Sequence, residues 1–168
     1  MEQKVHLNLM HIATKSSGKI DISFEVKTAE IAKNFSKILK RGDVVFLYGE
    51  IGVGKTTFIR HLINNFQKKN NLKLTEVTSP TFNLVNEYEA GNFIIQHYDL
   101  FRLRNSDEIK NIGLLENYNE TLTLIEWPEK IEKKIENKID LFFKYGDDMS
   151  KRFLSIKGIS NKKLNAII

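Results

Sequence analysis

The 168-residue chain contains no cysteine, two prolines and one tryptophan. Without cysteine it has no disulfide bonds and no thiolate metal ligands, which is consistent with a reducing compartment. No apolar run approaches the roughly 20 residues of a membrane-spanning helix. The N-terminus also lacks a basic segment leading into a continuous apolar core, as a secretory signal would have. We therefore expect a cytoplasmic protein that does not enter a membrane.

The net charge of +5 raises the question of a nucleic-acid partner. Lysine outnumbers arginine by 21 to 5, and 20 isoleucines and 16 asparagines accompany it. An A/T-rich coding sequence produces this bias without selection for binding, and the positive residues are spread along the sequence. We therefore expect the charge to cover the surface of a globule rather than to form a nucleic-acid patch.

Residues 48–57, YGEIGVGKTT, contain the pattern G-x-x-x-x-G-K-[ST]. Glycines allow successive backbone N–H groups to turn toward a phosphate, and the N-terminus of a following helix adds its positive dipole end. We expect Lys55 to contact the β and γ phosphates of a nucleoside triphosphate and Thr56 to hold Mg²⁺. The residues expected to contact the nucleotide are Gly49, Glu50, Ile51, Gly52, Val53, Gly54, Lys55, Thr56 and Thr57.

The sequence around this loop predicts the order strand, loop, helix that phosphate-binding loops require. Residues 44–48, VVFLY, form a continuous apolar run typical of a strand that is buried on both faces. Apolar residues from Phe58 to Phe66 recur at helical spacing. This context makes a chance match to the motif much less probable than the eight-residue pattern alone would suggest.

Other segments predict further strands and one more helix. Residues 19–27 alternate as a half-buried strand, and residues 28–40 follow a helical pattern that Thr28 is placed to cap. Two further pairs of segments predict hairpins: 82–89 with 93–99, around Gly91 and Asn92, and 139–145 with 151–157.

Two acids are candidates for the carboxylate that a phosphate-binding enzyme places at the end of a second buried strand. Asp99 follows an apolar stretch, and Glu126 ends the alternating run TLTLIE. A lone acid is more often a helix cap or a surface ion-pair partner, but the loop shifts the balance toward function. Trp127 and Pro128 then break the strand and are expected to start a helix.

The segment TSPTF offers a second loop near the site. Ser79 and Thr81 lie on either side of Pro80, in a loop that either approaches the γ phosphate as a switch element or simply makes a stiff turn into a strand. Composition alone favours neither interpretation.

Three more residues have two interpretations each. His97 is more simply a strand side chain than a catalytic base. Arg102 is more simply an ion-pair partner of Asp107 or Glu108 than a stabiliser of transition-state charge. Trp127 either packs beside the nucleotide or fills the core.

Three other functions fit parts of the sequence. Residues 137–140, NKID, match the guanine-reading signature of GTPases. In GTPases that signature follows a buried strand, whereas here it follows a charged segment. The sequence between the glycine-rich loop and NKID also contains no D-x-x-G motif. A small-metabolite kinase needs an arginine-rich lid, and only Arg102 and Arg104 lie close together in the sequence. A nucleotide-gated binding module without a catalytic purpose is the third alternative.

Four segments occur in one order: GEIGVGKTT, TSPTFNLVNEY, HYDLFRL and IEWPEKI. Together they resemble the TsaE family, formerly YjeE, the bacterial ATPases of tRNA threonylcarbamoyladenosine biosynthesis. The likeness runs from about Ile20 to about Gly158. It predicts an α/β fold, a P-loop NTPase-like three-layer sandwich with a central mixed β-sheet flanked by helices. One ATPase domain would span residues 20–168 after an N-terminal extension of residues 1–19.

The resemblance also implies roles for individual residues. The lysine and threonine of the loop, Lys55 and Thr56, would bind phosphates and Mg²⁺, and the SPTF segment would act as a switch. Glu126 of E-W-P would contribute to the metal site, with Asp99 as a second carboxylate. The chain departs from the family pattern at Phe101, where tyrosine is usual, and at Glu50 and Val53 of the loop.

The family relationship implies partners as well. It predicts an ATPase that acts with the TsaB and TsaD proteins, so that tRNA is reached through that complex. ATP binding and hydrolysis would reset or license the complex rather than make the threonylcarbamoyl bond. A chain without an arginine finger is expected to hydrolyse ATP slowly and to accelerate when a partner orders the site.

Overall fold

The computed structural model describes residues 18–132 and 134–168. Most of the predicted N-terminal extension, residues 1–17, lies outside the described residues, so the proposed division at residue 20 stays a prediction. The strands are β1 (Ile20–Asp21), β2 (Val44–Tyr48), β3 (Val85–Glu89), β4 (Ile94–Asp99), β5 (Thr121–Glu126), β6 (Lys138–Tyr145) and β7 (Arg152–Lys157). The α-helices are α1 (Glu25–Ile38), α2 (Lys55–Lys69), α3 (Ser106–Asn111) and α4 (Asn161–Asn165), with 3₁₀ turns η1 (Tyr118–Glu120) and η2 (Pro128–Lys130).

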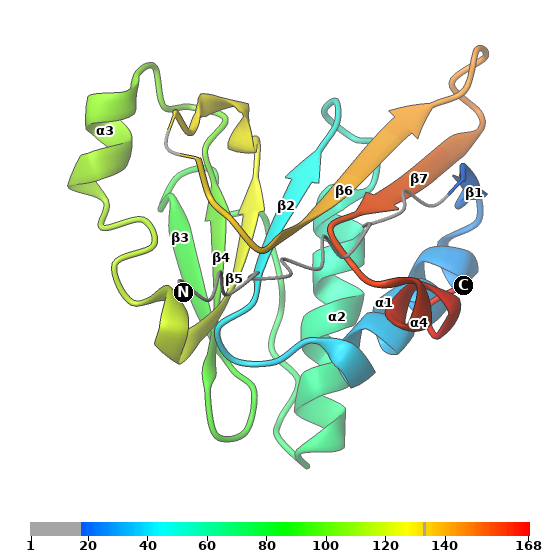
Figure 1. The fold of residues 1–168 in the computed structure, drawn as a ribbon, viewed down its shortest axis with the longest axis horizontal. Coiled ribbons are helices and arrows are strands. Elements are labelled where there is room, and N and C mark those ends of the chain that lie inside the picture. Colours follow the sequence, from blue (N-terminus) through cyan, green and yellow to red (C-terminus); the bar gives the residue numbers. More distant parts are fainter. Residues whose placement is uncertain (1–17, 133) are drawn as a thin grey trace, which may run out of the picture.

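The seven strands form one mixed sheet in the order β1-β7-β6-β2-β5-β4-β3 (Figure 1). The four middle strands, β6, β2, β5 and β4, run parallel, and antiparallel strands flank them on both sides. The carboxyl ends of β2, β5 and β4 therefore meet at one edge of the sheet. This edge is where ligands bind in open α/β folds.

Helices cover one face of the sheet across its whole width. Helices α1 and α2 pack side by side (Figure 1). The rings of Phe35 and Phe58 meet edge to face at 5.5 Å between centroids. The C-terminal helix α4 joins the same layer, because Ile167 is fully buried and its carbonyl accepts a hydrogen bond from the Asn34 amide of α1 at 3.1 Å. This layer fixes the axis of α2 beneath β2.

The opposite face is covered only in part. A second apolar cluster joins β2, β5 and β4 to the segment after β4, where Leu100, Leu103 and Ile109 are buried. Among the described residues, no side chain of β7 belongs to this second cluster, and none of β6 does. Among residues 18–132 and 134–168, no apolar layer covers the face of β6 and β7 that is turned away from α1 and α2.

Most predicted elements are confirmed. Strand β2 has the predicted bounds, α2 fades at the predicted QKKNN segment, and β6 pairs with β7 as an antiparallel hairpin. Strand β3 starts at Val85, later than predicted, because Leu84 has a left-handed backbone (φ +66°) and its N–H bonds to the Pro80 carbonyl at 2.6 Å. That turn keeps residues 82–84 out of the ladder.

The prediction of a strand over residues 19–27 was wrong beyond Asp21, where β1 ends. The Asp21 carboxylate accepts hydrogen bonds from both the backbone and the hydroxyl of Ser23, at 2.9 and 2.6 Å, and this turn ends β1. Helix α1 then begins at Glu25, so Thr28 lies buried inside the helix and does not cap it. The alternation misled because Phe24 and Val26, which extend the apolar face, are 79% and 76% exposed.

Candidate functional site

The glycine-rich loop joins the end of β2 to the start of α2. Gly49 has φ +139°, and a Cβ there would lie 2.5 Å from the Phe143 carbonyl oxygen of β6, so only glycine fits at this close approach. Val53 is 1% exposed and anchors the middle of the loop in the core. Gly54 precedes the helix in the left-handed region with φ +115°. The loop therefore wraps the N-terminus of α2, where backbone N–H groups point outward.

Lys55 is buried at the head of α2, with only 4% of its surface exposed. Its ammonium donates hydrogen bonds to the carbonyls of Gly49 and Glu50 at 2.7 and 3.0 Å, and it lies 4.3 Å from the centre of the Trp127 ring. Burial lowers the pKa of the Lys55 ammonium, and the charges of nearby carboxylates, Glu126 first, oppose that shift. The Lys55 ammonium is thus bound by two backbone carbonyls and lies near several carboxylates.

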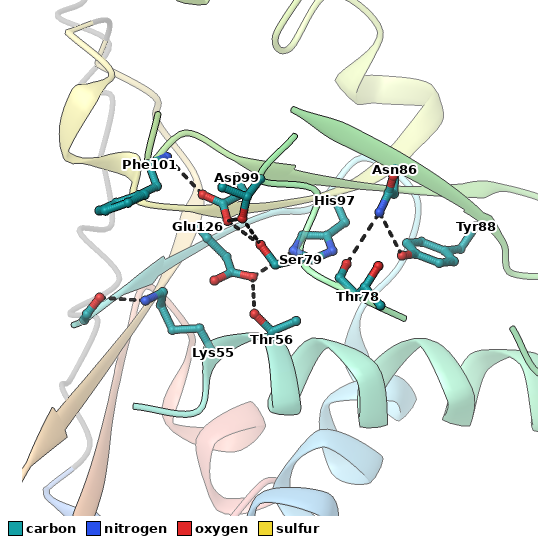
Figure 2. Close-up of polar contacts among 12 residues, drawn as sticks. Lys55, Thr56, Thr78, Ser79, Asn86, Tyr88, His97, Asp99, Phe101 and Glu126 are labelled. Atoms are coloured by element: carbon teal, nitrogen blue, oxygen red, sulfur yellow. Dashed lines mark hydrogen bonds and ion pairs between the residues drawn. The ribbon is translucent and has the colours of Figure 1, made fainter. Parts of the chain in front are cut away.

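Glu126 connects β5 to the loop. Its Oε1 accepts a hydrogen bond from the Thr56 hydroxyl at 2.9 Å and lies 2.9 Å from Nε2 of His97, as Figure 2 shows. A carboxylate oxygen accepts, so Nε2 of the imidazole donates. His97 is fully buried, and its Nδ1 has no hydrogen-bond partner within the part of the chain that the structure describes. Glu126 is thereby fixed from two sides and faces α2.

Asp99 connects β4 to the SPTF segment. One carboxylate oxygen accepts from the hydroxyls of Ser79 and Thr81, at 2.5 and 3.0 Å (Figure 2). The other oxygen accepts from the backbone N–H of Phe101 at 2.9 Å. This acid, 4% exposed, holds the segment around Pro80 against the end of its own strand.

These side chains surround a pocket of about 340 Å³, a size in the range of small-ligand sites. Its lining consists of Ile51, Gly52, Gly54, Lys55, Thr56, Thr57, Ser79, Thr81, Asp99, Phe101, Glu126 and Trp127. Of the residues predicted for the site, three do not line it: Gly49 and Glu50 supply carbonyls to Lys55, and Val53 supports the loop from the core. The structure thus brings both acids, the hydroxyls of Ser79 and Thr81 and the glycine-rich loop to one place.

Sequence reasoning underrated two residues. His97 was interpreted as an ordinary strand side chain, yet it contacts Glu126; its spacing of two from Asp99 on one strand was a usable signal, since such residues share a face. Phe101 was considered only for its missing hydroxyl, yet its ring lines the pocket at 4.9 Å from that of Trp127. Trp127 lines the pocket and also packs against the second apolar cluster. Its contact with a nucleotide stays a prediction.

The expectations for Arg102 and for a helix after Pro128 are not met, whereas the rejection of the NKID match as a guanine site agrees with the position of Asp140. Arg102 forms no ion pair with Asp107 or Glu108 in the described structure; its guanidinium lies 3.9 Å from the centre of the Phe82 ring. Asp140 of the NKID match pairs with Lys138 on β6, does not line the pocket and stands opposite Phe46 of β2. The predicted helix after Pro128 is a single 3₁₀ turn, η2.

The oxygen atoms of Thr56 and Glu126 suit a hard cation such as Mg²⁺. No group of three or more acidic or histidine side chains suited to a metal ion was found among residues 18–132 and 134–168. Mg²⁺ usually takes one or two protein oxygens and completes its shell with phosphates and water. The donor set therefore fits a metal that arrives with a nucleotide better than a metal held by protein alone.

The mixed sheet, its flanking helices and the loop at the head of α2 define a P-loop NTPase-like protein. The solved structure of YdiB from Bacillus subtilis has the same fold, with a TM-score of 0.68 over 91% of this chain and 92% of that one, at 24% sequence identity. None of the described helices is long and apolar enough to cross a membrane.

Sequence comparisons identify the family. The model of the family described as "Threonylcarbamoyl adenosine biosynthesis protein TsaE" matches residues 22–153. Proteins named tRNA threonylcarbamoyladenosine biosynthesis protein TsaE are similar: that of Rickettsia conorii is 40% identical over 86% of this chain and 79% of its own length. The Rickettsia typhi protein is 41% identical over 81% of this chain and 92% of its own length. The Haemophilus influenzae protein is 34% identical over 63% of this chain and 68% of its own length. The chain belongs to the TsaE family, and the resemblance found in the sequence is confirmed.

Proposed function

We propose that this protein is the Mg²⁺-dependent ATPase of tRNA threonylcarbamoyladenosine biosynthesis and acts in the cytoplasm as a switch on a TsaB–TsaD complex. The family membership supports the pathway. The observation that carries the ATPase proposal is the hydrogen bond between Thr56 of the loop and Glu126 of β5, because it places the threonine and the strand-end acid of such enzymes side by side.

In the proposed reaction, Lys55 exchanges the carbonyls of Gly49 and Glu50 for the β and γ phosphates of ATP. Thr56 and Glu126 hold the metal, and Asp99 positions the Ser79–Thr81 side of the pocket. Bound Mg²⁺ neutralises charge on the phosphate oxygens. Among the described residues, the lining contains one cation, Lys55, and no arginine. Transition-state charge is thus incompletely compensated, and we expect slow hydrolysis until a partner completes the site.

The experiment is ATP hydrolysis by the purified chain, alone and with the TsaB–TsaD pair, beside Lys55→Ala. We expect the pair to raise the rate and the substitution to abolish it at every Mg²⁺ concentration. Omitting Mg²⁺ should stop hydrolysis by the unaltered chain. Tryptophan fluorescence offers an independent measure of nucleotide binding, because Trp127 is the only tryptophan and lines the pocket.

The outcome that contradicts the proposal is a rate that is indifferent to the pair while ATP is consumed only after a small metabolite is added. That result would make the chain a P-loop kinase. A fluorescence change with ATP but no hydrolysis under any condition would instead indicate a nucleotide-gated binding module.

A further inference from the structure

A second, larger hollow lies on the uncovered face of the β6–β7 hairpin. Its volume is about 680 Å³, twice that of the nucleotide pocket, and it is lined by β6, β7, the turn between them and the residue before β1. Nothing in the proposed ATPase mechanism uses it.

Four lysines line this hollow: Lys19, Lys144, Lys151 and Lys157. All four are exposed, and in the described part of the chain none of them forms an ion pair. Other lysines, such as Lys110 on α3, do have an acidic partner. Two aspartates of the turn, at 147 and 148, also line the hollow, so four positive charges face two negative ones.

Aromatic rings lie between these lysines. Phe142 and Phe153 are half-buried on the same face, with the ammonium groups of Lys157 and Lys19 at 5.2 and 5.9 Å from their respective ring centres. Phe142 is held in place by stacking on Tyr48, at 4.6 Å and 12° between ring planes. The face therefore offers ring surfaces bordered by lysines that form no ion pair among the described residues.

Lysines beside partly exposed rings can bind unpaired nucleic acid, since phosphates contact the lysines and bases stack on the open ring surface. An acidic protein segment would use the charges but has no need of the rings. A duplex hides its bases from such rings. The chemistry on this face thus favours single-stranded or loop RNA.

We propose that the hollow on the β6–β7 face, formed by Lys19, Lys144, Lys151 and Lys157 with Phe142 and Phe153, binds an unpaired segment of RNA directly. This inference rests on the proposed function only in taking tRNA as the source of the RNA segment. The hollow also differs from our expectation that the positive charge is dispersed over the surface, because strand pairing brings together lysines that are far apart in the sequence.

One residue connects this hollow to the nucleotide site. Tyr145 lines the hollow, and its hydroxyl donates a hydrogen bond to the Ile51 carbonyl of the glycine-rich loop at 3.2 Å. RNA seated in the hollow would therefore contact the residue that supports the loop.

The test measures binding of a fluorescein-labelled tRNA anticodon stem-loop to the full chain by fluorescence polarisation, without ATP and without partner proteins, over a range of salt. The lysine variant is K144A/K157A, and the matched control is K33A/K162A, which removes two exposed lysines from α1 and α4. We expect the lysine variant to bind about tenfold more weakly and its slope of log affinity against log salt to fall by about 1.4, or about 0.7 for each lost phosphate contact. The control should match the unaltered chain.

A second variant separates stacking from charge. Phe153→Leu keeps an apolar side chain on β7 but removes the ring, and we expect about fivefold weaker binding with an unchanged salt slope. Circular dichroism melting of each variant tests whether the fold is intact.

Four results would overturn the proposal. The first is that the stem-loop does not bind at low salt, and the second is that the lysine variant binds it as tightly as the control does. The third is that a blunt RNA duplex of the same length binds as tightly as the stem-loop. The fourth is that the lysine variant loses its association with TsaB–TsaD while keeping its RNA affinity, which would make the face a protein-docking surface. Lys55→Ala should bind the stem-loop normally, so failure of the ATPase proposal and failure of this one are distinguishable.

Discussion

Asp99 and Glu126 occupy equivalent places in the sheet and yet have different partners. They are register neighbours at the carboxyl ends of the parallel strands β4 and β5, and they are 4% and 3% exposed. Glu126 contacts Thr56 of the glycine-rich loop, whereas Asp99 contacts Ser79 and Thr81 of the SPTF segment. The two acids therefore differ in their contacts because different segments lie opposite the ends of their strands, not because the strand ends differ.

This difference assigns the two sides of the pocket to different tasks. The Glu126 side, with α2, holds the metal and the phosphates in our proposal. The Asp99 side holds a loop whose anchoring hydroxyls a nucleotide or a partner protein can rearrange. Substitutions that remove one charge at a time should therefore give unequal effects.

The largest effect is expected for Glu126→Gln. The amide oxygen still accepts from Thr56 and His97, so the substitution removes the charge while keeping the acceptor. We expect single-turnover ATP hydrolysis to fall at least about 100-fold, because a preorganised charge at the reacting phosphate is lost.

The control for this substitution is Glu129→Gln, which removes a carboxylate whose charge also acts on Lys55 but which does not line the pocket. Its rate should stay within about twofold of the unaltered chain if the effect requires contact rather than charge at a distance. Equal losses in both variants would refute the role given to Glu126.

A smaller effect is expected for Asp99→Asn. The amide weakens the bonds to Ser79 and Thr81, and we expect the rate stimulated by TsaB–TsaD to fall about tenfold while the rate without partners changes less. Hydrogen exchange of the SPTF segment should accelerate. A raised Mg²⁺ requirement equal to that of Glu126→Gln would mean that the two acids share one task.

Arg102→Ala should change the basal rate by less than about threefold. Its guanidinium stacks on the ring of Phe82, which is 81% exposed, and exposed contacts of this kind contribute little. Rate measurements without partners test this prediction. A loss of 100-fold would show that Arg102 reaches the nucleotide and would restore the transition-state role considered from the sequence.

The smallest effect concerns an exposed carboxylate that does not line the pocket. Glu25 at the start of α1 bonds to Nε2 of His61 at 2.8 Å, and this bond, more than the nearby charge of Arg60, lowers the pKa of the Glu25 carboxyl. Because the folded pKa lies below the unfolded one, the unfolded chain binds more protons, and the stabilisation is present above about pH 5 and lost as the pH falls through the folded pKa.

Glu25→Gln should therefore lower the unfolding free energy by at most about 0.5 kcal/mol at pH 7, because solvent screens this pair, and by less at pH 3. Urea unfolding at the two pH values measures the difference. An equal loss at both would mean that packing, and not the charge, is responsible.

Much of the fold was predictable from local pattern. The apolar run 44–48 and the helical spacing after it gave the bounds of β2 and the course of α2, because both elements bury most of their side chains. The failures lie where local and distant contacts compete. At residues 19–27, the turn at Asp21 and the contacts of Glu25 with α2 prevailed over an alternating pattern.

The residues of the candidate site were also largely predictable, but the contacts between them were not. Residue types and spacing placed the loop, both acids and the SPTF hydroxyls among the candidates. The pairing of His97 with Glu126 was not predicted, because it depends on two strands that are neighbours in the sheet and distant in the chain.

The sequence by itself determined most of the strands, the two long helices, the phosphate-binding loop and the family, since these depend on residue types at short spacing. Only the tertiary structure decided which acid meets the loop and that unpaired lysines and phenylalanines share one face of β6 and β7. Strand order and register settle both, and they arise from the packing of the whole chain rather than from any one segment.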